Sequence, residues 1–269
     1  MAMSRSSAAT FAAILEAHTG QQLGSSRHWR IEMALAPLMR LRKLASLDHL
    51  ADALSQGREP ALAEAVSDAL LNNETFFYRE PAAFDLLGEA MLAMREARAA
   101  RRLAIWCAGC STGQEAYSLA MRFAEDARWE GWTIDILGTD VSRVVIAQAR
   151  SGLYSQFEIQ RGLPVRAMMR WFDSEGDRWR ASAALRGRVR FACHNLLDVP
   201  PAPSRCDVIL CRNVLLYFAE ARRTAVFERL AGAIAPDGIL MLGAGETALR
   251  QTDRFQPDGV HRGLYRPRP

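Results

Sequence analysis

Apolar positions recur at helical spacing through residues 1–71 of the chain. Phe11 and Leu15 lie four residues apart, as do Leu35 and Met39, which places each pair on one face of a helix. Short glycine-containing breaks separate these segments, and no alternating strand pattern occurs among them. The pattern predicts a small helical N-terminal domain over residues 1–71.

A different pattern begins with the polar and aromatic segment 72–80, which we interpret as a linker. Pro81 directly after it is suited to the first position of a helix. Beyond Pro81, short apolar runs alternate with helical patterns. The predicted strands are 103–107, 132–139, 188–193, 206–211 and 238–244, and the predicted helices include 111–125, 142–150 and 220–234. Strands that are apolar on both faces and alternate with helices predict an α/β domain over residues 81–269 with a doubly wound, mostly parallel sheet.

The β/α alternation is interrupted between about residues 153 and 187. Tryptophans and a Gly176-Asp177 turn predict a small antiparallel β insertion there, with Trp171 and Trp179 in its core.

Four of the predicted strands end in residues suited to a ligand. The first ends in a loop with Gly109 and Gly113, which has neither the three glycines of a dinucleotide fingerprint nor the Lys-Ser/Thr of a phosphate loop. Asp140 ends the second strand and is placed to accept hydrogen bonds from ribose hydroxyls, although an Asp there often caps the next helix instead. Asn195 follows the third strand, where its amide offers a donor and an acceptor to an adenine edge. Asn213 follows the fourth strand, beneath the same cleft. Because open α/β sheets bind ligands at the carboxyl ends of their strands, this pattern predicts a site for S-adenosylmethionine.

At these residues the chain resembles the CheR-type family of chemotaxis protein-glutamate O-methyltransferases. The matching motifs are Asn73-Glu-Thr-Phe-Phe-Tyr-Arg79-Glu, Ala108-Gly-Cys-Ser-Thr-Gly-Gln-Glu115, Thr139-Asp140, Asn195-Leu-Leu, Arg212-Asn-Val-Leu-Leu-Tyr-Phe218 and Pro236-Asp-Gly-Ile-Leu. The resemblance implies a class I S-adenosylmethionine-dependent methyltransferase domain together with a helical N-terminal domain and a small antiparallel β insertion. It also implies methyl transfer to glutamate side chains of chemoreceptors (methyl-accepting chemotaxis proteins), which forms methyl esters for sensory adaptation.

The resemblance further implies roles for individual residues. Arg79 and Tyr217 match the positions near the transferred methyl group, and the product is S-adenosylhomocysteine, with no metal. Gln114, Ala116 and the Gly-Ala-Gly segment before Glu246 depart from the family's usual residues without removing a ligand. The cofactor contacts implied are Asn73, Thr75, Arg79, Glu115, Asp140, Asn195, Leu196, Asn213 and Val214.

Charge bears on the partner. Lys+Arg 34 against Asp+Glu 30 gives a net charge of +4, and since Lys43 is the only lysine, codon usage also explains the arginine excess. The segment Arg27 to Lys43 nevertheless concentrates basic residues with Glu32 as its one acid. Such a run is often only the solvated face of a helix. Given the resemblance, it is a candidate docking face for the acidic helical cytoplasmic region of a chemoreceptor, and a nucleic-acid partner is not expected.

Composition and the chain start favour a cytoplasmic protein that is recruited to membrane receptor arrays without membrane insertion. Hydrophobic residues make up 49% and charged residues 24%, as in globular domains, and no apolar run is long enough to span a bilayer. Five cysteines, mostly in apolar runs, are expected to be reduced.

Alternatives remain for several features. Cys107 and Cys110 have the spacing of a zinc or redox pair, but no second such pair accompanies them. His194 is either a base or a loop residue. At the level of function, methyl transfer to RNA or a small molecule, and a cofactor-binding sensor without catalysis, are the two alternatives to receptor methylation.

Overall fold

The computed structural model describes residues 3–23, 28–57, 59–201 and 205–268. Arg27 of the basic segment lies outside the described residues, as do the side chains of residues 28–30. The chain divides into two compact units, one formed by residues 1–72 with 217–222 and the other by residues 73–216 with 223–269. Within the described residues, no helix has the length and apolar character needed to cross a membrane.

The first unit is helical, as its periodicity predicts. Its described helices are α1 (Arg5–Thr19), α2 (His28–Arg42), α3 (Leu47–Ser55) and α4 (Pro60–Leu70). Ser4 and Ser46 begin α1 and α3 by accepting a backbone N–H hydrogen bond with their hydroxyl groups, which satisfies one otherwise unpaired donor in each helix. Phe11 and Leu35, which define the predicted helix faces, are fully buried in the core of this unit.

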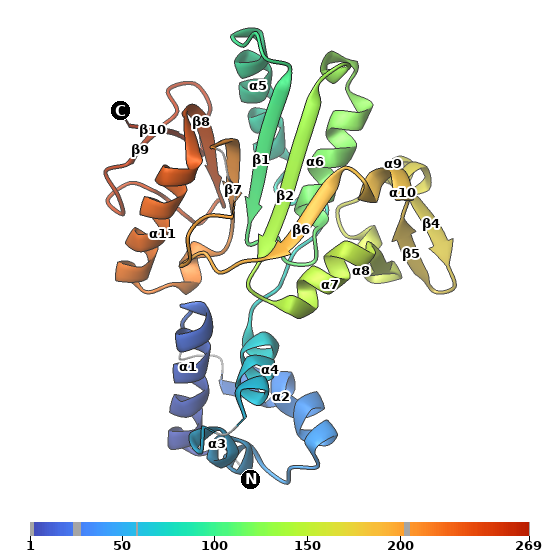
Figure 1. The fold of residues 1–269 in the computed structure, drawn as a ribbon. Helices are drawn as coiled ribbons and strands as arrows, with labels where there is room; N and C mark the ends of the chain where they lie inside the picture. Colours follow the sequence, from blue (N-terminus) through green and yellow to red (C-terminus); the bar gives the residue numbers. More distant parts are fainter. Residues whose placement is uncertain (1–2, 24–27, 58, 202–204, 269) are drawn as a thin grey trace. The chain divides into compact units, whose positions relative to one another are not determined.

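The second unit contains a mostly parallel sheet, which confirms the predicted fold class. Its strands lie in the order β6-β2-β1-β7-β8-β10-β9, with β10 antiparallel to its two neighbours (Figure 1). The bounds are β1 (Arg102–Ala108), β2 (Thr133–Asp140), β6 (Val189–Cys193), β7 (Cys206–Cys211), β8 (Ile234–Leu242), β9 (Phe255–Pro257) and β10 (Leu264–Pro267). The sequence did not predict β9 and β10, which have only three and four residues.

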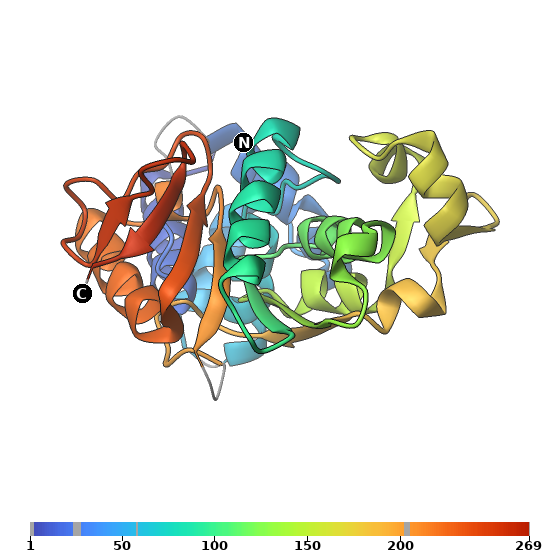
Figure 2. The same cartoon turned by 90° about the horizontal axis from the view of Figure 1, so that it is seen from above.

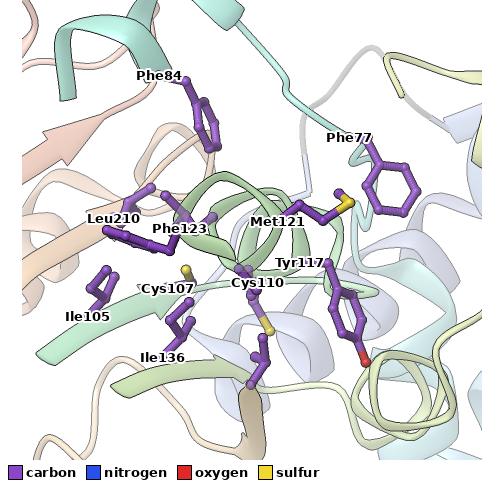
Figure 3. Close-up of a cluster of buried hydrophobic side chains, with 14 of the residues drawn as sticks. Phe77, Phe84, Ile105, Cys107, Cys110, Tyr117, Met121, Phe123, Ile136 and Leu210 are labelled. Atoms are coloured by element: carbon purple, nitrogen blue, oxygen red, sulfur yellow. The ribbon is translucent and has the colours of Figure 1, made fainter. Parts of the chain in front are cut away.

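Helices cover both faces of this sheet. The chain moves from β1 through α6 (Gln114–Glu125) to β2 and from β7 through α11 (Glu220–Ala233) to β8, in opposite directions along the sheet. Right-handed crossovers therefore place α6 and α11 on opposite faces, as Figure 1 shows. Together with α5 (Pro81–Glu96), α6 packs on alternate residues of β1. Figure 3 shows side chains of α6 in the same buried cluster as Ile105 and Cys107 of β1.

The insertion is an antiparallel sheet, as predicted, with the strand order β3-β5-β4. Its strands are β3 (Leu153–Ser155), β4 (Phe172–Glu175) and β5 (Arg178–Ala181). Figures 1 and 2 both show β4 and β5 beyond the β6 side of the main sheet, at the end opposite β9 and β10. Trp171 is buried and Trp179 packs partly buried against the same core. The predicted hairpin-like segment also contains short helices that the sequence did not reveal: α8 (Gln156–Gln160), α9 (Val165–Trp171) and α10 (Ala183–Arg186).

Two predicted boundaries were wrong by several residues. Helix α6 begins at Gln114 rather than at residue 111, because Ser111 (φ 50°) and Gly113 (φ 92°) have left-handed backbone that no α-helix contains. Strand β8 begins at Ile234 rather than at residue 238, since its pairing with β7 tolerates a register shift between Cys206 and Val208.

Candidate functional site

The carboxyl ends of four parallel strands lie side by side at one edge of the main sheet. Strands β6, β2, β1 and β7 are consecutive neighbours and parallel to one another. The residues at or just after the ends of these strands therefore share this edge, as the strand pattern predicted: Asn195, Asp140, the loop 109–113 and Asn213.

Asp140 is fixed against the loop that follows β1. Its carboxylate accepts hydrogen bonds from the backbone N–H groups of Ser111 at 2.9 Å and Ser142 at 3.1 Å. The side chain that caps α7 (Arg143–Ser151) is Ser142, which accepts from the N–H of Val145. Asp140 therefore does not serve as the helix cap, and that alternative is excluded.

The turn after β7 is closely packed. Asn213 has a positive φ of 58°, a left-handed conformation in which Asn is enriched among residues with a Cβ. Its Oδ1 is buried and has no hydrogen-bond partner among the described residues. The side chain of Val214 packs on Gly109 so closely that a Cβ at residue 109 would lie 2.5 Å from Val214 Cγ2. An unpaired amide oxygen beside a glycine loop is the arrangement expected of a ligand site.

Arg212 joins three parts of this edge through hydrogen bonds, a role that was not predicted from its position in the sequence. Its buried guanidinium donates hydrogen bonds to Glu115 Oε2 (2.9 Å), Glu80 Oε2 (3.0 Å) and the carbonyl oxygen of Arg79 (2.8 Å). Although burial alone lowers the pKa of Arg212, the carboxylates of Glu115 and Glu80 raise it above its usual value, so Arg212 stays cationic. Glu115, a predicted cofactor contact, is thereby held in place beside the strand end.

The linker docks on the second unit through its aromatic residues. Phe77 is fully buried, with its ring edge against Tyr154 (5.2 Å) and Phe172 (5.5 Å) of the insertion. The backbone of Gly162 approaches Phe77 so closely that a Cβ there would lie 2.1 Å from the Phe77 carbonyl oxygen. Full burial of a phenylalanine side chain contributes about 1.5–3 kcal/mol, so this contact holds the linker firmly.

Two hydrogen bonds bring the rest of the linker to the strand ends. The Ser111 hydroxyl donates to the carbonyl oxygen of Asn73 at 2.7 Å, and the N–H of Tyr78 donates to the Ser118 hydroxyl at 3.0 Å. Asn73 thus lies directly beside the loop that follows β1.

Arg79 lies half-buried on the same linker. Its guanidinium donates to the Glu74 carbonyl oxygen at 3.1 Å and lies 5.5 Å from the centre of the Phe76 ring. Arg161 of the insertion lies 4.4 Å from that ring and pairs with the Glu74 carboxylate at 2.5 Å. Two guanidinium groups therefore contact one aromatic ring at this edge.

Of the other predicted contacts, Leu196 is buried and Asn195 accepts a hydrogen bond from the N–H of Leu197 at 3.0 Å. Tyr217 belongs to the first compact unit. Its carbonyl oxygen accepts from the Gln22 N–H at 2.7 Å, and its hydroxyl accepts from the Asn72 side chain. Arg79 and Tyr217 therefore belong to different units of the chain.

Cys107 and Cys110 are buried side chains of the sheet core. Burial raises the pKa of both thiols well above the usual value, so they are protonated as they stand here. Among the described residues, no group of three His, Cys, Asp or Glu side chains is placed to hold a metal ion. His194 lies on the loop after β6, where its Nε2 is 2.9 Å from the Val199 carbonyl oxygen.

Known proteins are similar in sequence to this chain over nearly its whole length. A family model described as "CheR methyltransferase, SAM binding domain" matches residues 73–263. "Chemotaxis protein methyltransferase 1" of Pseudomonas aeruginosa is 34% identical over 252 residues, which cover 91% of this chain and 92% of that protein. "Chemotaxis protein methyltransferase" of Vibrio parahaemolyticus is 34% identical over 250 residues, with 91% and 90% covered.

Similarity to solved structures is weaker. Magnesium protoporphyrin IX methyltransferase from Synechocystis, solved with bound SAH, has 17% identity and a TM-score of 0.33, over 60% of this chain and 54% of that one. The sequence matches, not this likeness, carry the assignment.

Proposed function

Because the chain belongs to the CheR methyltransferase family, we propose that it transfers a methyl group from S-adenosylmethionine to glutamate side-chain carboxylates of chemoreceptors. The product on the receptor is a glutamate methyl ester, and the second product is S-adenosylhomocysteine. The observation that carries the proposal is the 34% identity to a chemotaxis protein methyltransferase over 91% of the chain, a span that exceeds the methyltransferase domain and includes part of the N-terminal helices.

The residues at the strand ends fit this cofactor. Asp140 is fixed by the backbone N–H groups of Ser111 and Ser142, and a carboxylate held in this way suits the two ribose hydroxyls. The buried Oδ1 of Asn213 lacks a partner among the described residues and is thus ready to accept a hydrogen bond. Glu115 is held by Arg212, and its carboxylate is proposed to bind the cationic end of the cofactor. The residues proposed to hold the cofactor are Asn73, Thr75, Arg79, Glu115, Asp140, Asn195, Leu196, Asn213 and Val214.

The proposed reaction needs little acid–base catalysis from the protein. S-adenosylmethionine, when bound, supplies an electrophilic methyl group on a sulfonium sulfur. A glutamate side chain, with a usual pKa of about 4.3, is already a carboxylate at neutral pH, so no residue has to act as a general base. The chain's task is to orient that carboxylate and exclude water, and orientation of this kind contributes about 7–11 kcal/mol to lowering a barrier.

Arg79 and Tyr217 are the residues proposed to orient the reacting groups. The planar guanidinium of Arg79 suits two parallel hydrogen bonds to a carboxylate, either that of the substrate or that of the cofactor's amino-acid end. The hydroxyl of Tyr217 is proposed to orient the attacking glutamate oxygen.

The receptor is proposed to dock on the basic end of α2. Arg40, Arg42 and Lys43 are exposed there. A groove of about 510 Å³ is lined by Arg40 and Lys43, by the apolar side chains of Met39 and Leu44, and by the acidic residues Glu32 and Asp48. A groove that combines cationic and apolar lining suits an amphipathic helix with an acidic face. Binding at this surface would bring a cytoplasmic enzyme to membrane receptor arrays.

The test uses S-adenosylmethionine labelled at the methyl group and purified cytoplasmic fragments of candidate chemoreceptors. We expect label on the receptor that is released as methanol at alkaline pH, and its loss when the methylated glutamates are replaced by alanine. Base-stable label on RNA or on a small molecule would instead indicate a different methyl transfer. Cofactor binding without label on any acceptor would indicate a sensor.

A further inference from the structure

The carboxylate of Glu246 accepts hydrogen bonds from five backbone N–H groups. Glu246 lies just after β8, and no role was predicted for it from the sequence. Its Oε1 accepts from Val214 (2.9 Å), Leu215 (2.7 Å) and Leu216 (3.3 Å), and its Oε2 accepts from Asn213 (2.6 Å) and Gly243 (2.9 Å). One side chain thus holds four consecutive N–H groups of the turn after β7.

Four of these N–H groups, those of residues 213–216, precede or begin the short 3-10 helix η3 (Leu215–Tyr217). The first N–H groups of a helical turn have no partner within it, and here the Glu246 carboxylate accepts them. A carboxylate is the strongest acceptor for such donors, because its hydrogen bonds are assisted by its charge. Glu246 is half-buried, so part of this interaction is shielded from water.

The turn has a special backbone geometry that Glu246 and Gly243 hold from two sides. Asn213 has left-handed backbone, a conformation that Asn adopts more readily than most residues with a Cβ. Gly243 approaches this residue so closely that a Cβ would lie 2.8 Å from the Asn213 backbone nitrogen. The turn is therefore clamped between Gly243 and the Glu246 carboxylate.

We propose that Glu246 is a positioning residue for the cofactor. By holding the turn, it fixes the orientation of the Asn213 amide, whose buried Oδ1 is unpaired among the described residues, and the contact of Val214 with the Gly109 loop. This inference rests on the proposed function in one respect, namely that Asn213 and Val214 contact S-adenosylmethionine.

Replacing Glu246 by glutamine separates the effect of the carboxylate's charge and acceptor oxygens from the effect of side-chain size. The two side chains have nearly the same size, but the amide has one oxygen and an NH₂ group that would face N–H donors. Loss of charge-assisted hydrogen bonds of this kind corresponds to about 10- to 100-fold in an equilibrium constant. Glu246→Asp keeps both oxygens and the charge, and shortens the reach by one methylene group.

The first measurement needs no cofactor. Hydrogen–deuterium exchange of the ligand-free protein is followed in a peptide that covers residues 213–216, with α6 as an internal reference. We expect faster exchange in this peptide for Glu246→Gln, an intermediate rate for Glu246→Asp, and no change for Glu89→Gln, a control at an exposed position of α5.

The second measurement is the Kd for S-adenosylhomocysteine by calorimetry. We expect about 10- to 100-fold weaker binding for Glu246→Gln, a smaller loss for Glu246→Asp and wild-type binding for Glu89→Gln. A role limited to global stability would lower the number of binding sites and leave Kd unchanged, and that result would overturn the proposal, as would wild-type exchange at residues 213–216. Failure of the wild-type protein to bind would overturn the proposed function, whereas the exchange data would still decide whether Glu246 holds the turn.

Discussion

At the scale of residues, a candidate functional side chain can be predicted from the sequence when it stands at the end of a predicted strand. Asp140, Asn195 and Asn213 were predicted because each follows an apolar run at the end of a strand. Arg212 and Glu246 were not, because their partners are remote: Arg212 pairs with Glu115, 97 positions away, and Glu246 with N–H groups about 30 positions away. A charged residue in a short loop looks like solvated surface until the folded backbone shows what surrounds it.

The side chain of Arg79 provides the first test at this scale. Because misorientation of reacting groups by about 1 Å costs on the order of 100-fold in rate, we expect Arg79→Ala to lower kcat for receptor methylation by about that factor. The bond from Arg212 reaches the carbonyl oxygen of Arg79, so the substitution leaves the linker attached. Initial rates with a receptor fragment measure kcat, and calorimetry with S-adenosylhomocysteine measures Kd.

The split between these two quantities identifies the carboxylate that Arg79 holds. An unchanged Kd assigns it to the substrate, whereas a raised Kd assigns it to the amino-acid end of the cofactor. Arg79→Lys retains the positive charge but lacks the planar guanidinium, so its kcat should lie between those of wild type and Arg79→Ala. Arg188→Ala, at an exposed position of the same unit, is the control. Wild-type kcat and Kd in Arg79→Ala would exclude both roles.

At the scale of elements, strands with a continuous apolar run and helices with repeated helical spacing were predicted from the sequence. The shortest helices and strands were not. Strand β7 was predicted to the residue because all of Cys206–Cys211 is apolar except one position. Helices α8 and α10 have 5 and 4 residues, too few for a 3.6-residue period to appear. The start of α6 was missed because left-handed backbone at Ser111 is decided by packing and not by the residue type.

The packing of the linker on the insertion gives a prediction for a substitution at Gly162. Gly162→Ala adds a methyl group 2.1 Å from the Phe77 carbonyl oxygen, so the linker has to move. We expect this clash to cost about 1–3 kcal/mol of unfolding free energy beyond the cost of the left-handed backbone, and to weaken S-adenosylhomocysteine binding. Urea denaturation and calorimetry measure the two effects.

Gly176→Ala is the matched control for this change. Gly176 also has positive φ (65°, against 83° at Gly162), but a Cβ there meets nothing within 4 Å. The control therefore carries the backbone cost of about 1–2 kcal/mol without the clash. Equal losses of stability in the two variants, with equal cofactor binding, would show that Gly162 serves only its own turn.

At the scale of the whole molecule, the β/α alternation was sufficient to predict the sheet class, because right-handed crossovers leave few ways to arrange such a chain. The sequence could not show that residues 217–222 group with the N-terminal helices. That grouping depends on contacts such as the one between the Tyr217 carbonyl oxygen and the Gln22 N–H, which join positions far apart in the chain. Net charge was equally uninformative until the exposed residues of α2 were located.

Charge at the end of α2 gives a prediction about recognition of the receptor. The double variant Arg40→Glu/Lys43→Glu reverses two exposed charges that line the groove, and it leaves the Arg42–Glu59 ion pair intact. A pair of unit charges 4 Å apart interacts by about 1 kcal/mol in water, so we expect the KM for an acidic receptor fragment to rise about 10-fold or more at low salt. The Kd for S-adenosylhomocysteine should stay at its wild-type value.

Salt and a charge-matched control separate docking from overall charge. Added salt screens exposed charges, so the difference in KM between wild type and this variant should shrink as ionic strength rises. Arg188→Glu/Arg190→Glu changes the net charge equally at exposed positions of the second unit and should leave KM near the wild-type value. If both double variants raise KM alike, attraction depends on the charge of the whole molecule and α2 is not the docking face. If neither does, the receptor binds elsewhere, and the arginine-rich composition reflects codon usage alone.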